Sequence, residues 1–384
     1  MRIALSGVET NNKGAELMLY AILQEIERKF PKAIVYLPYR AKWQGDGYKI
    51  YTKLDLRNNP YEKVNFLLEK YRIKRILHKL RIHKFDSMYR GEWAIPCCKY
   101  YLDASGFAIS DQQSVYRGWL EGLVNQVINY SKLGTKIICL PQAVGPFEGD
   151  VARDAILIYS RLVDIFFARE EISYNYMKSV GYNMNKVLIS GDFTSLVEGV
   201  FPQRYDHLRG GICIIPNSKM ISSQKITFDK YIELLSLIAN ECKKHSRPIY
   251  LLNHEGVGDE RIAYKCSKLL NDTVEVVTNI NALEVKGLIS SAYLCISSRF
   301  HGVVSALNSN VPCLATSWSH KYEALFNDYG QHNCILPLND NEECMSLIKK
   351  NLQRDVNSEI RIQLSKRIPY IKEETYKMWK KVWA

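Results

Sequence analysis

Residues 293–317 have the sequence YLCISSRFHGVVSALNSNVPCLATS, and this stretch decides the fold class. Its two ends, 293–298 and 311–317, are short apolar runs with the length and composition of buried strands. Between them a helical pattern begins near Gly302. A strand, a helix and a second strand in this order predict two parallel strands joined by a crossover helix.

The same alternation continues on both sides of this stretch. In the second half of the chain, strands are expected at 211–216, 248–253 and 274–278, and helices begin near Phe228, Glu260, Ala282 and Tyr322. In the first half, strands are expected at 2–6, 34–39, 99–105, 136–142, 164–168 and 186–190, with helices at 14–28 and 119–133. This alternation predicts an α/β protein made of two Rossmann-like domains with an interdomain cleft.

The boundary between the domains is expected in the stretch from Gly191 to Gly210, which holds a proline, three glycines and no clear period. We therefore predict an N-terminal domain at 1–195 and a C-terminal domain at 205–365. A last helix at 366–384 is expected to cross back to the N-terminal domain.

The charge of the chain predicts a negatively charged partner. The 384 residues include 52 Lys and Arg against 40 Asp and Glu, a formal charge of +12. A phosphorylated small molecule, a nucleic acid or an anionic membrane surface would each fit this charge. The sequence has no recognisable nucleic-acid-binding module, so no nucleic-acid partner is expected.

The ten cysteines form no CxxC pair and no Cys/His group with zinc-ligand spacing. Most lie in apolar runs, where cysteine acts as a small hydrophobic residue. Buried thiols of this kind predict a reducing compartment. The first residues lack the features of a signal peptide, and no window has the ~20 apolar residues of a membrane span. A cytoplasmic protein, at most peripheral on the inner face of the membrane, is expected.

Two basic stretches are candidates for membrane contact. Residues 70–84 carry seven Lys and Arg, and apolar residues recur there with a helical period. Residues 376–384 combine Tyr376, Trp379 and Trp383 with lysines. Both patterns are typical of interfacial helices that lie on anionic lipid. The alternative for each is a helix that packs on its domain and turns a solvated basic face outward.

Ligands of open parallel sheets bind beyond the carboxyl ends of the strands. The predicted strand 293–298 is followed by Arg299 and by His301 at a helix start, and the strand 311–317 is followed by Lys321. An Arg fork and a Lys charge beside a helix N-terminus suit a phosphate and a carboxylate. A histidine suits proton transfer. The alternative is a surface pair of cations with a capping histidine.

Two further groups are weaker candidates. His254 and Glu255 follow the strand 248–253, and either is a second candidate for proton transfer. Asn12, Gly14 and Glu16 follow the first strand and would line the same cleft. Gly7 and Gly14 are too far apart for GxGxxG, so a dinucleotide site is not expected. The sequence has no P-loop, HExxH or GxSxG motif.

The segment SRFHGVVSALNSNVP, followed by SHKYE, resembles the signature of the polysaccharide pyruvyl transferase family. The upstream segments NNKGAE (11–16), LPQAVGPF (140–147), AREEIS (168–173) and GDFT (191–194) fall in the order that this family has. The resemblance therefore extends from residue 1 to about residue 330.

The resemblance implies a two-domain, GT-B-like fold and the transfer of a pyruvyl group from phosphoenolpyruvate to two hydroxyls of a sugar. The product would be a cyclic ketal, and a hexose 4,6-diol is the first choice of acceptor. No metal or redox cofactor is implied. Bacterial surface polysaccharides are built on the cytoplasmic face of the membrane, so the acceptor is expected on a polyprenyl diphosphate lipid.

The resemblance also assigns roles to residues. The family's donor-binding arginine and lysine correspond to Arg299 and Lys321, its catalytic histidine to His301, and its first-domain arginine to Arg169. Asp103 opens the turn DASGF, which replaces a glycine-rich turn of the family and holds one glycine, Gly106. Asp103, with Asn12, Gly14 and Glu16, is a candidate for acceptor contact or for support of the site. The resemblance thus implies that the N-terminal domain is the acceptor side of the cleft and the C-terminal domain the donor side.

Two other functions stay open at this point. A GT-B glycosyltransferase would use a nucleotide sugar and would need a carboxylate for the ribose, for which Glu255 is available. An inactive scaffold protein on the membrane is the other alternative. The intact set of Arg299, His301 and Lys321 argues against it, because a decayed site would lose its charges first.

Overall fold

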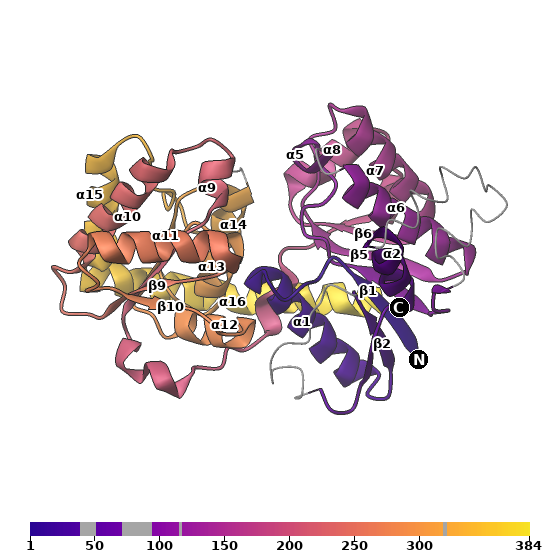
Figure 1. Cartoon of the computed structure of the whole chain (residues 1–384), viewed down its shortest axis with the longest axis horizontal. Coiled ribbons are helices and arrows are strands. Elements are labelled where there is room, and N and C mark those ends of the chain that lie inside the picture. Colours follow the sequence, from indigo (N-terminus) through magenta and orange to yellow (C-terminus); the bar gives the residue numbers. More distant parts are fainter. Residues whose placement is uncertain (39–50, 71–93, 115–116, 318–320) are drawn as a thin grey trace. The chain divides into compact units, whose positions relative to one another are not determined.

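The computed structural model describes residues 1–38, 51–70, 94–114, 117–317 and 321–384 (Figure 1). The chain divides into two compact units. Unit 1 comprises Met1–Thr10, Met18–Phe193 and Met378–Ala384, and unit 2 comprises Asn11–Leu17 and Thr194–Lys377. The basic helix expected at 70–84 lies, except for Lys70, outside the described residues.

Unit 1 contains a parallel sheet of seven strands in the order β3-β2-β1-β4-β5-β6-β7. Its strands are β1 (Arg2–Ser6), β2 (Ile34–Leu37), β3 (Asp55–Asn58), β4 (Tyr100–Asp103), β5 (Lys136–Gln142), β6 (Ile165–Ala168) and β7 (Val187–Ile189). Its helices are α1 (Lys13–Lys29), which starts in unit 2, α2 (Pro60–Lys70), α5 (Asp111–Ser114), α6 (Arg117–Lys132), α7 (Asp150–Leu162) and α8 (Glu171–Ser179). Short 3₁₀ turns follow at Met184–Lys186 and Phe193–Leu196.

The order of the strands reverses between β1 and β4, and Asp103 lies at the end of β4. Its carboxylate is fully buried and accepts hydrogen bonds from the Ser105 amide (3.0 Å), the Ser105 hydroxyl and the Tyr159 hydroxyl (3.2 Å). Burial raises the pKa of Asp103, and these donors oppose the rise. Asp103 therefore fixes the turn that follows β4.

Gly7 ends β1 at the same reversal point, and it has a φ of +73°. A Cβ at this position would lie 2.2 Å from the amide nitrogen of Ser105. Backbone cannot yield as a flexible side chain does, so only glycine fits here.

We expect Gly7→Ala to lower the free energy of unfolding by more than about 3 kcal/mol, from left-handed strain of ~1–2 kcal/mol and the added steric clash. Urea unfolding would measure the change. Gly181→Ala is the matched control, because Gly181 has a φ of +78° and an added Cβ there would meet no atom within 4 Å. If Gly7→Ala and Gly181→Ala lose the same free energy of unfolding, the close packing of Gly7 against the Ser105 backbone does not determine the effect.

The C-terminal residues Met378–Ala384 pack within unit 1. The ring of Trp383 lies edge-on to Phe30 and to Tyr100, at 5.3 Å from each, and its Nε1 donates to Glu25 (3.1 Å). Trp379 is fully buried and lies edge-on to Phe193 at 5.8 Å. The two tryptophans of the proposed interfacial helix are thus used in packing.

Tyr376, by contrast, is 45% exposed, and the neighbouring Lys377, Lys380 and Lys381 are also exposed. What this helix presents outward is therefore mainly positive charge. Within the described parts of the chain, no helix combines the length and the apolar character that a membrane crossing requires.

Unit 2 contains a parallel sheet of five strands in the order β10-β9-β8-β11-β12. Its strands are β8 (Ile212–Ile215), β9 (Ile249–Leu252), β10 (Glu275–Val277), β11 (Leu294–Ser297) and β12 (Cys313–Ala315). Its helices are α9 (Lys219–Ser222), α10 (Phe228–Cys242), α11 (Gly256–Leu269), α12 (Ala282–Ser290), α13 (Phe300–Asn308), α14 (Lys321–Asp328), α15 (Asn341–Leu352) and α16 (Arg354–Val382). A 3₁₀ segment spans Gln203–Leu208.

The core of unit 2 forms because its central strands are apolar on both faces, as parallel strands covered by helices must be. All four residues of β8 and of β11 are buried. Cys213, Cys295 and Cys313 lie side by side in the register of β8, β11 and β12. The cysteines are free thiols, and all except Cys97 are buried. They act as small core residues.

Two segments differ from the sequence prediction. The last helix begins at Arg354 and not near 366, and it continues through Pro369. The segment Asn11–Leu17 packs with unit 2, although it lies in the predicted N-terminal domain.

Candidate active site

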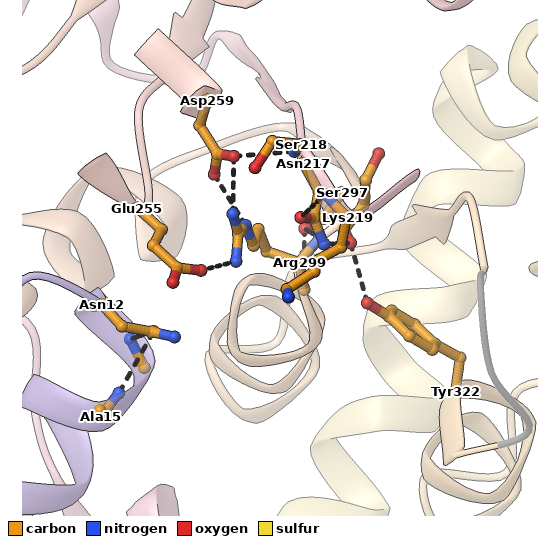
Figure 2. A network of polar contacts seen from close by, with 12 residues as sticks. Asn12, Ala15, Asn217, Ser218, Lys219, Glu255, Asp259, Ser297, Arg299 and Tyr322 are labelled. Carbon is orange, nitrogen blue, oxygen red and sulfur yellow. Dashed lines mark hydrogen bonds and ion pairs between the residues drawn. The ribbon is translucent and has the colours of Figure 1, made fainter. Parts of the chain in front are cut away.

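The strand order of unit 2 reverses between β8 and β11, which is where ligands bind in open parallel sheets. Asn217 follows β8, Glu255 follows β9 and Arg299 follows β11. Figure 2 shows these three residues in one network of polar contacts. The sequence motif around Arg299 therefore lies at the edge of the sheet that the fold favours for binding.

Arg299 is held by two carboxylates. Its Nε and Nη2 donate to the two oxygens of Asp259 at 2.7 and 2.6 Å, and its Nη1 is paired with Glu255 (Figure 2). The residue is only 7% exposed, and burial lowers its pKa to about 10, so the guanidinium is cationic at neutral pH. The fork is fixed in orientation before any ligand binds.

Asp259, in the first turns of α11, is a site residue that the sequence analysis missed. It is fully buried, and it also accepts a hydrogen bond from the Ser218 amide at 2.8 Å. Burial raises the pKa of Asp259, and the hydrogen bonds from Ser218 oppose the rise by stabilising the carboxylate. The available signal was its position: Asp259 lies in the first turn of a helix that starts directly after Glu255, which is its N-cap residue.

The segment Asn217–Lys219, after β8, was also missed. The Asn217 side chain donates to the carbonyl of Ser298 (2.8 Å) and accepts from the amide of Lys219 (2.8 Å). Asn217 thus joins the loops after β8 and β11. Lys219 is exposed and belongs to the same network (Figure 2). The sequence signal for the segment Asn217–Lys219 was its position just after the predicted strand 211–216.

The start of α1 meets the start of α13 within unit 2. A Cβ on Gly14 would lie 2.3 Å from Nδ1 of His301, so the glycine and the imidazole are in direct contact. Asn12 forms an isolated antiparallel bridge with Glu255, and the Lys13 amide donates to the carbonyl of His254 (3.1 Å). The structure therefore brings Asn12 and Gly14 together with His254, Glu255 and His301.

His254 is buried, and its Nδ1 has no hydrogen-bond partner among the described residues. Burial, followed by the charges of Arg299, His301 and Lys13, holds its pKa well below the ordinary value. His254 is therefore neutral at physiological pH and cannot serve as an imidazolium acid.

Glu16 is buried beside the same segment. Its carboxylate is paired with Lys13 Nζ at 2.7 Å, and burial raises its pKa. Glu16 therefore stabilises the start of α1 from within and offers little surface to a ligand.

Lys321 is the first residue of α14, and its Nζ lies 5.2 Å from the centre of the Phe300 ring. The next residue, Tyr322, donates its hydroxyl to the Ser298 carbonyl (2.8 Å; Figure 2). The start of α14 is thereby attached to the loop that carries Arg299.

Arg169 belongs to unit 1, directly after β6, and is buried. Its amide donates to the Gln142 carbonyl (3.0 Å), and its Nε lies 3.7 Å from Glu170. Asp103 also belongs to unit 1. That Arg169 and Asp103 act in the same site as Arg299, His301 and Lys321 stays a prediction.

No cluster of three or more His, Cys, Asp or Glu with the arrangement of a metal site occurs among the residues that the structure describes.

Comparison with solved structures identifies the fold type. A putative UDP-N-acetylglucosamine 2-epimerase from Listeria monocytogenes is similar over 98% of this chain and 94% of its own, with 10% identity and a TM-score of 0.61. Anabaena Alr3699/HepE, in complex with UDP and glucose, is similar over 99% and 100%, with 10% identity and a TM-score of 0.59. S. aureus MnaA with UDP is similar over 95% and 90%, with 12% identity and a TM-score of 0.58.

At these identities the likeness concerns the fold alone. It confirms the prediction of an α/β protein with two Rossmann-like domains of the GT-B-like type. A search of curated proteins gives no match.

The family comparison is more specific. The model of the family described as polysaccharide pyruvyl transferase matches residues 12–320, which is most of the chain. The match includes Asn12, Arg169, His254, Arg299 and His301. This extent confirms the resemblance first seen in the motifs, and the chain belongs to the polysaccharide pyruvyl transferase family.

Proposed function

We propose that the protein transfers the enolpyruvyl group of phosphoenolpyruvate to two hydroxyls of a saccharide, forming a cyclic ketal and releasing phosphate. The family supports a transferase of polysaccharide biosynthesis. The observation that carries the proposal is the position of Arg299 and His301 at the start of α13, beside the strand reversal of unit 2.

The chemistry of the donor sets what the site must supply. Phosphoenolpyruvate is an enol ester, and a proton added to its methylene carbon makes C2 electrophilic. One sugar hydroxyl then attacks C2 and loses its proton, which restores the acid. The second hydroxyl forms the other C–O bond as the C2–O bond to phosphate breaks, and its proton leaves with phosphate. A general acid and cations for the anionic donor are required.

We assign the acid to His301 and not to His254. His254 is held neutral by burial beside Arg299, so it has no second proton to give. Glu255, the other alternative, is engaged with Arg299.

Donor binding by Arg299 involves a competition. Asp259 takes the Nε and Nη2 side of the fork, and Glu255 takes Nη1. The Glu255 side chain is 31% exposed, whereas that of Asp259 is fully buried. We therefore propose that the anionic donor displaces Glu255 and that Asp259 keeps the guanidinium in place. Lys321 and, by family resemblance, Arg169 of unit 1 complete the set of cations.

The acceptor is proposed to be a saccharide on a polyprenyl diphosphate lipid, and no metal or redox cofactor is required by the chemistry. The formal charge of +12 and the exposed lysines of α16 support a cytoplasmic protein that approaches anionic lipid electrostatically.

Calorimetric titration with phosphoenolpyruvate tests the donor. We expect saturable binding that the Arg299→Ala variant loses, and no saturable binding of UDP- or GDP-sugars. Phosphate release that depends on an added saccharide would then identify the acceptor. Binding of a nucleotide sugar alone would favour a GT-B glycosyltransferase, the second candidate, which the UDP complexes of structurally similar proteins and the carboxylate of Glu255 support.

A further inference from the structure

We propose that Gly14 is a positioning residue for His301: the side chain that it lacks leaves the space in which the imidazole lies. The proposal rests on the catalytic role given to His301 above, and it assigns Gly14 a purpose other than contact with the acceptor.

The contact involves the base of the histidine side chain. A Cβ on Gly14 would lie 2.3 Å from Nδ1, 2.6 Å from Cγ and 3.0 Å from Cβ of His301. Rotation of the ring about its own axis moves Nδ1 but leaves Cγ and Cβ where they are. Any side chain at position 14 therefore forces His301 to another rotamer or moves one of the two helix starts.

The start of α1 is fixed on several sides. The Asn12 side chain caps the helix by accepting from the Gly14 amide (2.9 Å) and, more weakly, from the Ala15 amide (3.4 Å). The Lys13 amide donates to the His254 carbonyl, and the buried Glu16 is paired with Lys13. A shift of this turn would break these contacts together.

The start of α13 is fixed as well. A Cβ on Gly302 would lie 2.4 Å from Ser297 Oγ and 2.9 Å from Ile215 Cδ1, so this turn packs directly on the sheet. Ser297 Oγ accepts from the Arg299 amide (3.0 Å) and donates to the Arg299 carbonyl (2.9 Å). Since neither helix start can retreat, the imidazole is the part that gives way.

The helical position of Gly14 makes the effect separable from helix propensity. Alanine favours a helix over glycine, so without the clash Gly14→Ala would stabilise the protein. With the clash it destabilises. Whether Gly14→Ala lowers or raises the free energy of unfolding therefore shows whether the contact with His301 outweighs the helix propensity of alanine.

The test is a double-mutant cycle of Gly14→Ala and His301→Ala, with Gly122→Ala as control. Gly122 lies in α6 with no atom within 4 Å of the added Cβ. Urea unfolding gives the midpoint of each variant. Steady-state kinetics give kcat and KM for phosphoenolpyruvate.

We expect Gly14→Ala to lower the urea midpoint in the presence of His301 and to lower it less in the His301→Ala background, where the contacts with Nδ1 and Cγ are gone and only the 3.0 Å contact with Cβ remains. We expect kcat to fall about 100-fold, the effect of misplacing a catalytic group by about 1 Å, with KM for phosphoenolpyruvate changed less than about threefold. In the His301→Ala background, Gly14→Ala should cause no further loss of kcat. Gly122→Ala should retain wild-type kinetics.

Equal shifts of the midpoint in both backgrounds, or a Gly14→Ala variant with wild-type kcat, would overturn the proposal. If the wild type does not turn over phosphoenolpyruvate, the proposed function fails, and the unfolding cycle still decides the contact. If Gly14→Ala then shifts the urea midpoint by different amounts with His301 and with Ala at position 301, the positioning of His301 is supported. Equal shifts in the two backgrounds would reject it.

Discussion

Arg299→Ala is expected to lower the free energy of unfolding of unit 2 by about 3–5 kcal/mol, because it leaves the buried carboxylate of Asp259 without a cation. Urea unfolding would measure the loss. The double variant Arg299→Ala/Asp259→Asn should recover much of it, since the uncompensated charge is gone, yet still fail to bind phosphoenolpyruvate in calorimetry. Stability and donor binding are thereby separated.

Arg204→Ala is the matched control for Arg299→Ala. Arg204 is paired with Glu284 at 2.9 Å in the same unit, but its side chain is 52% exposed. An exposed ion pair contributes no more than about 1 kcal/mol. If Arg299→Ala loses no more free energy of unfolding than Arg204→Ala, the stabilising role of the buried pair with Asp259 is wrong. If the Arg299→Ala/Asp259→Asn double variant binds phosphoenolpyruvate, the role of Arg299 in donor binding is wrong.

His301→Ala is expected to lower kcat by about 10²- to 10⁴-fold, the usual contribution of a general acid. Its affinity for phosphoenolpyruvate should stay within a few-fold of the wild type, because the cations that hold the donor are unchanged. Phosphate release and calorimetry measure the two quantities. His207→Ala, at an exposed histidine of unit 2, should leave both unchanged.

The assignment of roles depends on the contrast between these two variants. If donor affinity falls equally in His301→Ala and in the Arg299→Ala/Asp259→Asn double variant, the division between acid and anion binding is wrong. A His301→Ala variant with wild-type kcat would leave the protonation step to another residue.

Most strands could be predicted because apolar residues are concentrated in them. The run KIICLPQ coincides with β5, Lys136–Gln142. The strand β3, Asp55–Asn58, was missed because its sequence, DLRN, is mostly polar. It lies at the edge of its sheet and is largely exposed, so it needs few apolar residues. The early start of α16 was missed because proline is typical of a helix's first turn, whereas Pro369 lies well inside this helix.

The candidate site could be predicted where a motif follows a strand, as for Arg299 and His301. The pairing of Arg299 with Asp259 could not, because it depends on β9 and β11 both flanking β8, and strand order is a property of the whole sheet. The packing of Gly14 on His301 joins residues from opposite ends of the family match, and periodicity carries no information on such a contact.

The helices α1 and α16 each contribute residues to both units, and this has a consequence for synthesis on the ribosome. Unit 2 needs Asn11–Leu17, which are made before the rest of that unit, and unit 1 needs Met378–Ala384, which are made only after Thr194–Lys377 of unit 2. A nascent chain that has reached Phe193 therefore lacks the Trp379 ring that covers this phenylalanine. Unit 1 therefore cannot complete its packing until Met378–Ala384 have emerged, so the folding of the first half of the chain must wait for the synthesis of unit 2.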